Sequence, residues 1–326
     1  LMAKKRVLSG IRATGRLHLG NYLGAVKGML ALQDDPDFET FYMVADAHAI
    51  TTPYNKDELA NNVREVVLDY LAAGLDPDKS TIFVQSMVPE HFELAHYLSA
   101  VVTVNRMQHL PTFKDKIKQQ PEEASMALLN YPVLMAADIL AYKAGDVPVG
   151  VDQEPHLEIS RRIARNINSA FGTDFPEPKI FKTEGAYIPS LLGEGKMSKS
   201  VTGSFIELTD DLETIEARLS KVPTDSGKGD SVPTEGAVAN LLMFVETFQG
   251  AEKRKIYEDL YTSEGLRYGD LKKELAGAIY ETLQPLQKAR KEMESIVDEV
   301  IEKGAIKARK VASQTLKEVK EKMGFI

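Results

Sequence analysis

The first half of the chain alternates between two hydrophobic patterns. Apolar, β-rich runs predict buried strands at residues 6–11, 40–50, 81–87 and 147–150. Helical spacing of apolar positions predicts helices at residues 56–74 and 153–172. Alternating strands and helices indicate an α/β fold whose parallel sheet is covered by helices on both faces.

The pattern changes near Leu212, after which no strand-like run occurs. Helices are expected over residues 236–248, 271–304 and 305–324. Loops rich in Gly, Pro and Ser occupy residues 187–204 and 222–236, and we expect a domain boundary within residues 187–211. The sequence therefore predicts an α/β domain over residues 2–200 and an all-α domain over residues 201–326.

Composition is that of an ordinary globular protein, with 43% hydrophobic and 27% charged residues. The absence of cysteine excludes disulfides and thiolate metal sites. The most apolar run, residues 126–142, is interrupted by Asn130, Pro132 and Asp138, and is too short and polar to span a bilayer. With no signal-peptide pattern at the start, we expect a cytoplasmic protein that does not enter a membrane.

Charge is unevenly distributed along this acidic chain, whose net charge is −8. Residues 303–322 carry seven basic side chains and two acidic ones. Such a basic stripe can bind phosphates, as in RNA recognition, or can simply be the solvated face of a helix.

The stretch TGRLHLGNYLGA, residues 14–25, lies where the first strand gives way to a helix. His18 and Asn21 are expected on the first helical turn, on one face. Free backbone N–H groups and the helix dipole make such a turn suitable for an anion. The stretch by itself does not identify that anion.

Several familiar active-site motifs are absent. No G-x-G-x-x-G follows the first strand, and neither H-E-x-x-H nor G-x-S-x-G occurs. The segment GEGKMS resembles part of a P-loop, but Ser190 replaces its first glycine and Met197 its magnesium-binding Ser or Thr. The sequence argues against a dehydrogenase, a zinc protease, an α/β-hydrolase and a P-loop ATPase.

The segment KMSKS, residues 196–200, places two lysines and two serines in a glycine-rich loop. Ammonium groups on a mobile loop suit the negative charge that develops on a leaving polyphosphate. The alternative is a solvated linker whose lysines serve solubility.

HLGN and KMSKS, in this order and about 180 residues apart, resemble the paired signatures of class I aminoacyl-tRNA synthetases. The first signature of that family usually ends in histidine, whereas Asn21 stands here and can hydrogen-bond but carries no charge. Gly-Asn at this place is common in the tryptophanyl branch. The bacterial members of that branch are also similar in these segments: residues 9–25, 45–51, 106–116, 131–140, 147–158 and 196–200.

This resemblance covers essentially the whole chain and is strongest over residues 6–200. It implies a Rossmann-like catalytic domain over residues 2–200 and a helical tRNA-binding domain over residues 201–326. The implied reaction activates L-tryptophan with ATP, releases pyrophosphate, and passes tryptophan to tRNA(Trp). Magnesium would arrive with ATP rather than on a protein metal site, and the chain would form a homodimer.

The resemblance also implies roles for particular residues. His18 and Asn21 would hold phosphate, while Lys196 and Lys199 would stabilise the departing pyrophosphate. The wider ATP site would comprise Arg12, Ala13, Thr14, Gly20, Asn21, Lys116, Gly150, Val151, Asp152, Ile188, Lys196, Met197, Ser198, Lys199 and Ser200. Arg12 and Ala13 replace the family's frequent Gln-Pro, so the adenine and ribose contacts there are open. Asp152 can equally be a helix N-cap, and the lysines near residue 116 can face water.

Asp138 lies in an apolar helical run, one face of which also carries Tyr131 and Met135. A carboxylate there requires hydrogen-bond donors, and a cap, a salt bridge or a backbone N–H would supply them. The resemblance implies that Asp138 accepts the indole N–H of tryptophan, with Met135 against the ring. It places Leu8, His48, Tyr131 and Gln153 in the same pocket, although Leu8 and His48 also suit a plain core.

The residues leave tryptophan and tyrosine open, because a phenol O–H would satisfy Asp138 as well as an indole N–H. The segment LMAADIL, residues 134–140, favours tryptophan, but only through its resemblance to the tryptophanyl branch. A tyrosyl enzyme and a noncatalytic nucleotide- or RNA-binding paralogue are therefore the alternatives.

Overall fold

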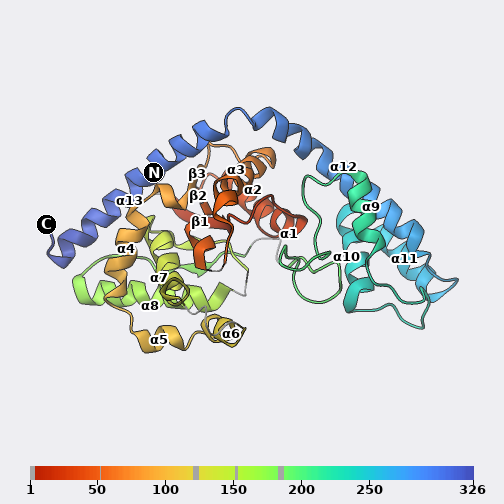
Figure 1. Ribbon diagram of the computed structural model, residues 1–326, viewed down its shortest axis with the longest axis horizontal. Helices are drawn as coiled ribbons and strands as arrows, with labels where there is room; N and C mark the ends of the chain where they lie inside the picture. Colours follow the sequence, from red (N-terminus) through yellow and green to blue (C-terminus); the bar gives the residue numbers. More distant parts are fainter. Residues whose placement is uncertain (1–3, 52, 120–124, 151–152, 183–186) are drawn as a thin grey trace. The chain divides into compact units, whose positions relative to one another are not determined.

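The computed structural model describes residues 4–51, 53–119, 125–150, 153–182 and 187–326 (Figure 1). Val151 and Asp152 lie outside the described residues, as does the side chain of Lys116. The chain forms two compact units. Unit 1 comprises Leu1–Gly15, Lys27–Glu184 and Glu294–Ile326, and unit 2 comprises Arg16–Val26 and Gly185–Met293.

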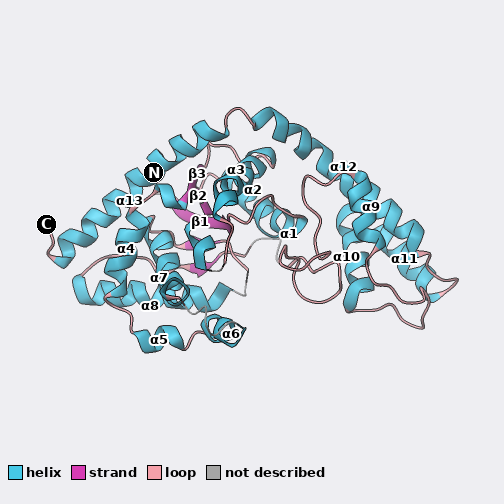
Figure 2. Ribbon diagram, viewed as in Figure 1, coloured by secondary structure: helices cyan, strands magenta, loops and turns pink. Residues whose placement is uncertain are grey.

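Unit 1 is built on a five-stranded parallel sheet in the order β3-β2-β1-β4-β5 (Figure 2). The strands are β1 (Lys5–Arg12), β2 (Phe38–Ala45), β3 (Thr81–Val84), β4 (Asp146–Val147) and β5 (Lys179–Ile180). The order reverses between β1 and β4, which is the switch point of a Rossmann-like sheet. The predicted α/β class is confirmed, and β5 is an additional strand.

Helices cover both faces of this sheet. The unit contains α2 (Lys27–Asp34), α3 (Lys56–Ala72), α4 (Glu90–Ser99), α5 (Val104–Gln108), α6 (Pro111–Gln119), α7 (Met126–Ala141), α8 (Glu154–Phe171) and α13 (Val297–Met323). Tyr42 in β2 donates its hydroxyl to the Met29 carbonyl of α2 (2.6 Å), whereas its neighbours Phe41 and Met43 pack in the core with α4, α7 and α8. Strands buried on both faces explain the continuous apolar runs of the sequence.

Three predicted strands are shorter than expected: the strand expected over residues 147–150 is only β4 (Asp146–Val147), and the other two end at one shared side chain. The strand expected over residues 40–50 ends at Ala45 and a 3₁₀ turn, η2 (Ala47–Thr51), follows. The strand expected over residues 81–87 ends at Val84 before η3 (Gln85–Met87). Asp46 Oδ1 accepts the backbone N–H groups of Ala47 and Ser86, each at 2.9 Å. This carboxylate binds both strand ends together and replaces the sheet hydrogen bonds there.

Unit 2 joins the HLGN segment to the chain after residue 185. It contains α1 (Leu19–Asn21), a π-helical turn η1 (Tyr22–Val26), α9 (Leu212–Ser220), α10 (Gly236–Gln249), α11 (Ala251–Thr262) and α12 (Tyr268–Met293). The backbone N–H of Leu19 donates to the Ile206 carbonyl (2.9 Å), and that of Leu208 donates to the Leu17 carbonyl (3.0 Å). The two compact units therefore do not meet at the single boundary expected near residue 200, because unit 2 also includes Arg16–Val26 and unit 1 also includes Glu294–Ile326.

The last helix also departs from expectation. The sequence predicted a break near residue 304, but α12 ends at Met293 and α13 runs through Gly304 without interruption. Gly304 lies against β3, where an added Cβ would come within 1.7 Å of the Ile82 carbonyl oxygen. Glycine here permits a close crossing of helix and strand, rather than ending a helix. Helix α13 therefore belongs to the sheet unit and not to the helical one.

Candidate active site

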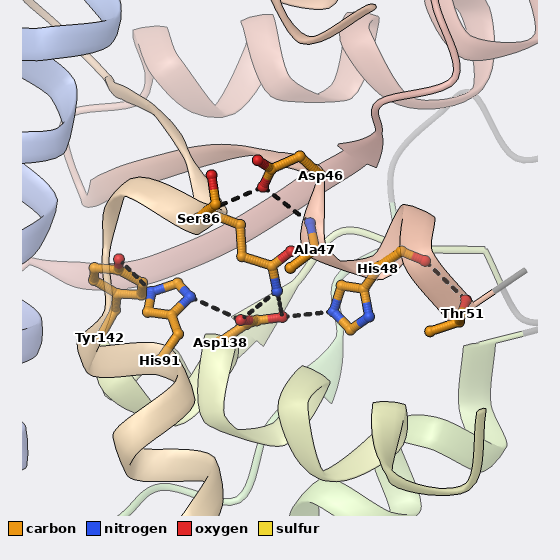
Figure 3. A network of polar contacts seen from close by, with 9 residues as sticks. Asp46, Ala47, His48, Thr51, Ser86, His91, Asp138 and Tyr142 are labelled. Carbon is orange, nitrogen blue, oxygen red and sulfur yellow. Dashed lines mark hydrogen bonds and ion pairs between the residues drawn. The ribbon is translucent and has the colours of Figure 1, made fainter. Parts of the chain in front are cut away.

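Asp138 on α7 is the centre of a buried polar cluster (Figure 3). Its side chain is 2% exposed, and both carboxylate oxygens accept hydrogen bonds. His48 Nε2 lies 2.8 Å from Oδ2, His91 Nδ1 lies 2.7 Å from Oδ1, and Gln85 Nε2 lies 2.9 Å from both. Three side chains, rather than a helix cap or a backbone N–H, hold this carboxylate.

The donors come from segments that follow neighbouring strands. His48 lies in η2 after β2, Gln85 begins η3 after β3, and His91 lies in the first turn of α4. The carboxyl ends of parallel strands share one edge of the sheet, which is the usual binding edge of α/β proteins. Asp46 fixes these two ends relative to each other through its two accepted N–H groups.

The family resemblance places Asp138 and His48 in one pocket, but the sequence does not predict that Gln85, His91 and Tyr142 complete the cluster. The available signal was the polar Gln85 directly after an apolar strand, at the edge where Asp46 ends the neighbouring strand. Nothing local distinguishes His91 or Tyr142, since their partners lie 47 and 51 positions away along the chain.

The cluster keeps Asp138 ionised. Burial raises the pKa of this carboxyl, but the hydrogen bonds and electrostatic interactions that His48 and His91 make with it outweigh burial and lower the pKa to about 2. Asp138 can only accept hydrogen bonds, and its protein donors surround it. Beside it, the buried Gln85 Oε1 is an acceptor with no hydrogen-bond partner among the described groups. The cluster around Asp138 therefore offers acceptors to a ligand group that donates.

A second network brings together two more of the expected pocket residues. The Tyr131 hydroxyl lies 2.6 Å from His156 Nε2, and His156 Nδ1 lies 3.0 Å from Gln153 Oε1. The rings of Tyr131 and His48 meet edge to face at 6.4 Å, which connects this network to Asp138. His156 is buried between the two residues and was not anticipated from sequence.

The apolar members of the expected pocket both pack in the main hydrophobic core, Leu8 within it and Met135 at its edge. Met135 is half-buried on α7, one turn before Asp138. Leu8 is buried in β1 and packs within the main hydrophobic core.

In unit 2 the HLGN and KMSKS segments contact each other. The Gly20 N–H donates to Met197 Sδ (3.2 Å), although the two residues lie 177 positions apart. A Cβ on Gly20 would come within 2.9 Å of the His18 ring and 3.1 Å of Met197 Cβ. Glycine is needed at this position because these two side chains approach its backbone so closely.

Asn21 presents donors at this site. Its Oδ1 accepts the backbone N–H of His18 (3.2 Å), so the oxygen closes the helix start. The amide group therefore directs its N–H donors elsewhere, which is the polarity that a phosphate or ribose oxygen requires.

The KMSKS segment is anchored on both sides. Met197 N–H donates to the Ile188 carbonyl (3.0 Å), and Asn240 of α10 donates to the Ser190 carbonyl (2.8 Å). Lys199 Nζ lies 3.6 Å from Glu207 Oε1, and Lys196 is exposed. Ser198 and Ser200 face each other, with their hydroxyl oxygens 2.9 Å apart.

The remaining residues of the expected ATP site lie in both units. Ala13 is buried at the end of β1, and its neighbours Arg12 and Thr14 are exposed. The Gly150 carbonyl accepts the Gln153 N–H (3.0 Å) where α8 begins. Ile188 is buried beside Met197. In the part of the chain that is described, no group of three or more His, Asp or Glu side chains is arranged to hold a metal ion.

His18 is expected to stay neutral down to a pH of about 4. Burial, and then the charges of Lys199 and Lys196, lower its pKa from 6.5 to about 4. Because the unfolded chain binds a proton between pH 6.5 and 4 and the folded chain does not, stability falls as pH drops through that window. NMR titration of the imidazole measures the pKa, which Lys199→Met should raise. Titration near 6.5 in the unmodified protein would contradict the assignment.

Much of the basic stripe at residues 303–322 is engaged in unit 1. Arg309 pairs with the largely buried Glu90 (3.1 Å), Lys320 pairs with Glu93 (3.0 Å), and Lys307 donates to the Pro77 carbonyl (2.8 Å). Lys303 pairs with Glu299 within the helix. These contacts hold α13 against unit 1.

None of the described helices combines the length and apolar character needed to cross a membrane.

The chain is similar over nearly its full length to proteins of known family. The profile of the family described as tRNA synthetases class I (W and Y) matches residues 2–284. A tryptophan–tRNA ligase of Porphyromonas gingivalis is 41% identical over 98% of this chain and 99% of its own, and one of Caldanaerobacter subterraneus is 43% identical over 99% of both. The crystal structure of Campylobacter jejuni tryptophanyl-tRNA synthetase with ADP and tryptophan superimposes with a TM-score of 0.85, at 32% identity, over 98% of this chain and 99% of that one.

The match spans both signatures, the Asp138 helix and nearly the full length of each relative. The parallel sheet and the helical remainder agree with the solved structure. The chain belongs to the class I tRNA synthetases of the tryptophan and tyrosine family, and within it to the bacterial tryptophanyl group.

Proposed function

We propose that this chain activates L-tryptophan with ATP, forming tryptophanyl-adenylate and pyrophosphate, and then transfers tryptophan to tRNA(Trp). The observation that carries the choice of amino acid is Asp138, a buried ionised carboxylate among donors at the binding edge of the sheet. An indole N–H donates and cannot accept, so it complements this carboxylate. Phenylalanine would leave Asp138 without that hydrogen bond, which is a strong basis for rejection.

The proposed roles in unit 2 concern phosphate. Asn21 donates from its amide, and Lys196 and Lys199 bring positive charge. The tryptophan carboxylate attacks the α-phosphorus in line, the bond to the bridging oxygen breaks, and pyrophosphate leaves. No covalent protein nucleophile is needed, so catalysis consists of positioning and of electrostatic stabilisation of the leaving group.

Neutral His18 fits this proposal because a buried imidazolium beside two lysines would be unfavourable. An imidazole with one N–H can donate to a phosphate oxygen without adding charge. His18 Nδ1 is buried without a partner among the described groups, so it is available to a ligand. Magnesium is proposed to be held by the ATP phosphates.

Three further parts of the proposal concern partners and location. Residues 201–326 are proposed to bind tRNA, through the helices of unit 2 and through the basic stripe on α13 of unit 1, and binding experiments can test each of them. The assembly is proposed to be a homodimer, which light scattering measures directly. Because its tRNA substrate is used in translation, the reaction is proposed to occur in the cytoplasm.

ATP–pyrophosphate exchange tests the central proposal when run separately with tryptophan, tyrosine and phenylalanine. Exchange with tryptophan alone is the expected result. Exchange with tyrosine would replace the amino acid in the proposal, and no exchange from folded, ATP-binding protein would favour a noncatalytic paralogue.

Lys199→Ala is expected to lower the rate constant for exchange by about a hundredfold, because the ammonium group stabilises charge that develops as pyrophosphate leaves. The KM for tryptophan should change little, since Asp138 and its donors are unaltered. Lys255→Ala, which removes an exposed lysine of α11, is the matched control and should retain full activity. A normal exchange rate in Lys199→Ala would exclude the assigned role.

A further inference from the structure

A second layer of buried side chains, His91 and Tyr142, extends the hydrogen-bond network of Asp138 into the core. His91 is fully buried, and its Nε2 lies 2.7 Å from the hydroxyl of the fully buried Tyr142 (Figure 3). Its other nitrogen, Nδ1, is bonded to Asp138. The ring stands edge to face against Phe83, with centroids 5.9 Å apart, and against Tyr142 at 5.4 Å. His91 is therefore held by packing as well as by hydrogen bonds.

The hydrogen-bonded series Asp138–His91–Tyr142 permits one arrangement of protons when the His91 imidazole is neutral. An ionised carboxylate only accepts, so Nδ1 of His91 must carry the hydrogen that Asp138 receives. Nε2 is then an acceptor, and the Tyr142 hydroxyl donates to it. Burial, followed by the charges of Asp138 and Glu90, raises the pKa of Tyr142, so this hydroxyl keeps its proton.

We propose that His91 and Tyr142 are positioning residues for amino-acid selection, because they fix the orientation and acceptor strength of Asp138 toward the indole N–H. This inference rests on the proposed function and extends it to two residues that are fully buried in the structure. Tyr142 selects the tautomer of His91, and His91 occupies the inner side of Oδ1. Such outer hydrogen bonds orient a buried group and increase its polarity, as they do for metal ligands.

The same arrangement of hydrogen bonds also affects whether the pocket prefers tryptophan or tyrosine. His48, His91 and Gln85 already donate to Asp138, and Gln85 Nε2 lies 2.9 Å from both carboxylate oxygens, so a ligand donor has to share an oxygen with them. The unsatisfied buried atom beside it, Gln85 Oε1, is another acceptor. A phenol hydroxyl brings lone pairs that need a donor, whereas the described donors here are already directed at Asp138. The arrangement favours an indole N–H, which only donates.

The test compares two ligands that differ at the one atom concerned. L-tryptophan and 3-(benzothiophen-3-yl)alanine have similar shape, but sulfur replaces the N–H in the second. Calorimetric titration gives the ratio of their dissociation constants, which isolates the value of the N–H contact. Tyr142→Phe is expected to reduce the preference for tryptophan about threefold to tenfold while leaving the affinity for the analogue unchanged.

Two substitutions of His91 separate positioning from packing. His91→Leu removes both hydrogen bonds and should reduce the preference further than Tyr142→Phe does. His91→Asn places an amide donor near the position of Nδ1 and should restore much of the preference. If His91→Leu fails to fold, Tyr142→Phe and His91→Asn still carry the test.

Tyr42→Phe is the matched control. Tyr42 is equally buried in unit 1, and its hydroxyl donates to the Met29 carbonyl rather than to the cluster. The control should lose some stability but keep the wild-type preference for tryptophan.

The outcomes distinguish the inference from the function on which it rests. A wild-type preference that persists in Tyr142→Phe, or an equal loss of affinity for both ligands, would overturn the positioning role alone. Equal binding of both ligands by the wild-type protein would overturn the proposed use of Asp138 and this inference with it.

Discussion

Asp138→Asn is expected to lower kcat/KM for tryptophan in ATP–pyrophosphate exchange by about a thousandfold or more. The substitution preserves shape but replaces an anion that accepts at both oxygens with an amide that accepts at one. Both oxygens of Asp138 already receive protein donors. The amide N–H₂ group would therefore face a donor from His48 or His91, and the indole N–H would lose its anionic partner.

Asp46→Asn is the control for this experiment because it makes the same chemical change in the same cluster of segments. The N–H groups of Ala47 and Ser86 both donate to a single oxygen of Asp46, Oδ1, and asparagine retains that oxygen. The control should keep activity within about tenfold of the wild-type protein. Comparable losses in both variants would show that Asp138 has only a structural role.

Asp138→Asn should also change stability in acid. The pKa of Asp138 is about 2 in the folded chain and near 3.9 when unfolded, so the unfolded state binds more protons between these values. Its contribution is present above pH 4 and is lost as pH falls toward 2. Urea titrations of the two proteins should therefore converge as the pH is lowered through this window.

Gly304→Ala is expected to destabilise unit 1 by about 3 kcal/mol, which is the upper end of the usual cost of overpacking. The added Cβ would lie 1.7 Å from the Ile82 carbonyl oxygen and 2.7 Å from its carbon. Both atoms belong to the backbone of β3 and cannot rotate aside. Helix α13 would have to move away from the strand, which would disturb its ion pairs with α4.

Gly277→Ala provides the matched control, since Gly277 also lies inside a long helix, α12, but has open space around its Cβ position. Alanine favours helix and should stabilise this site by about 1 kcal/mol. Thermal unfolding monitored by circular dichroism should move in opposite directions for the two variants. Equal midpoints would show that α13 does not pack closely against β3.

The local sequence was sufficient wherever structure follows from a short period or a compact motif. Strand and helix spacing gave the α/β class, because it depends on residues close together in sequence, whereas HLGN and KMSKS pointed to phosphate chemistry only through their resemblance to a known family. Tyr131, Met135 and Asp138 were placed on one helix face because they too are close together in sequence, and they do lie on α7.

Only the tertiary structure decided which groups complete the sites. Gln85 and His91 reach Asp138 from distant segments because their elements converge at one edge of the sheet, whereas Tyr142 directly follows the helix of Asp138 and joins the cluster only through His91. The backbone bonds between residues 17–19 and 206–208 assign the HLGN segment to unit 2, and Gly304 assigns α13 to unit 1. A sequence determines the local periods and the identity of its polar groups. Hydrogen bonds and close packing between segments far apart along the chain form only when the fold places those segments side by side. No local pattern in the sequence states which distant segments will become neighbours.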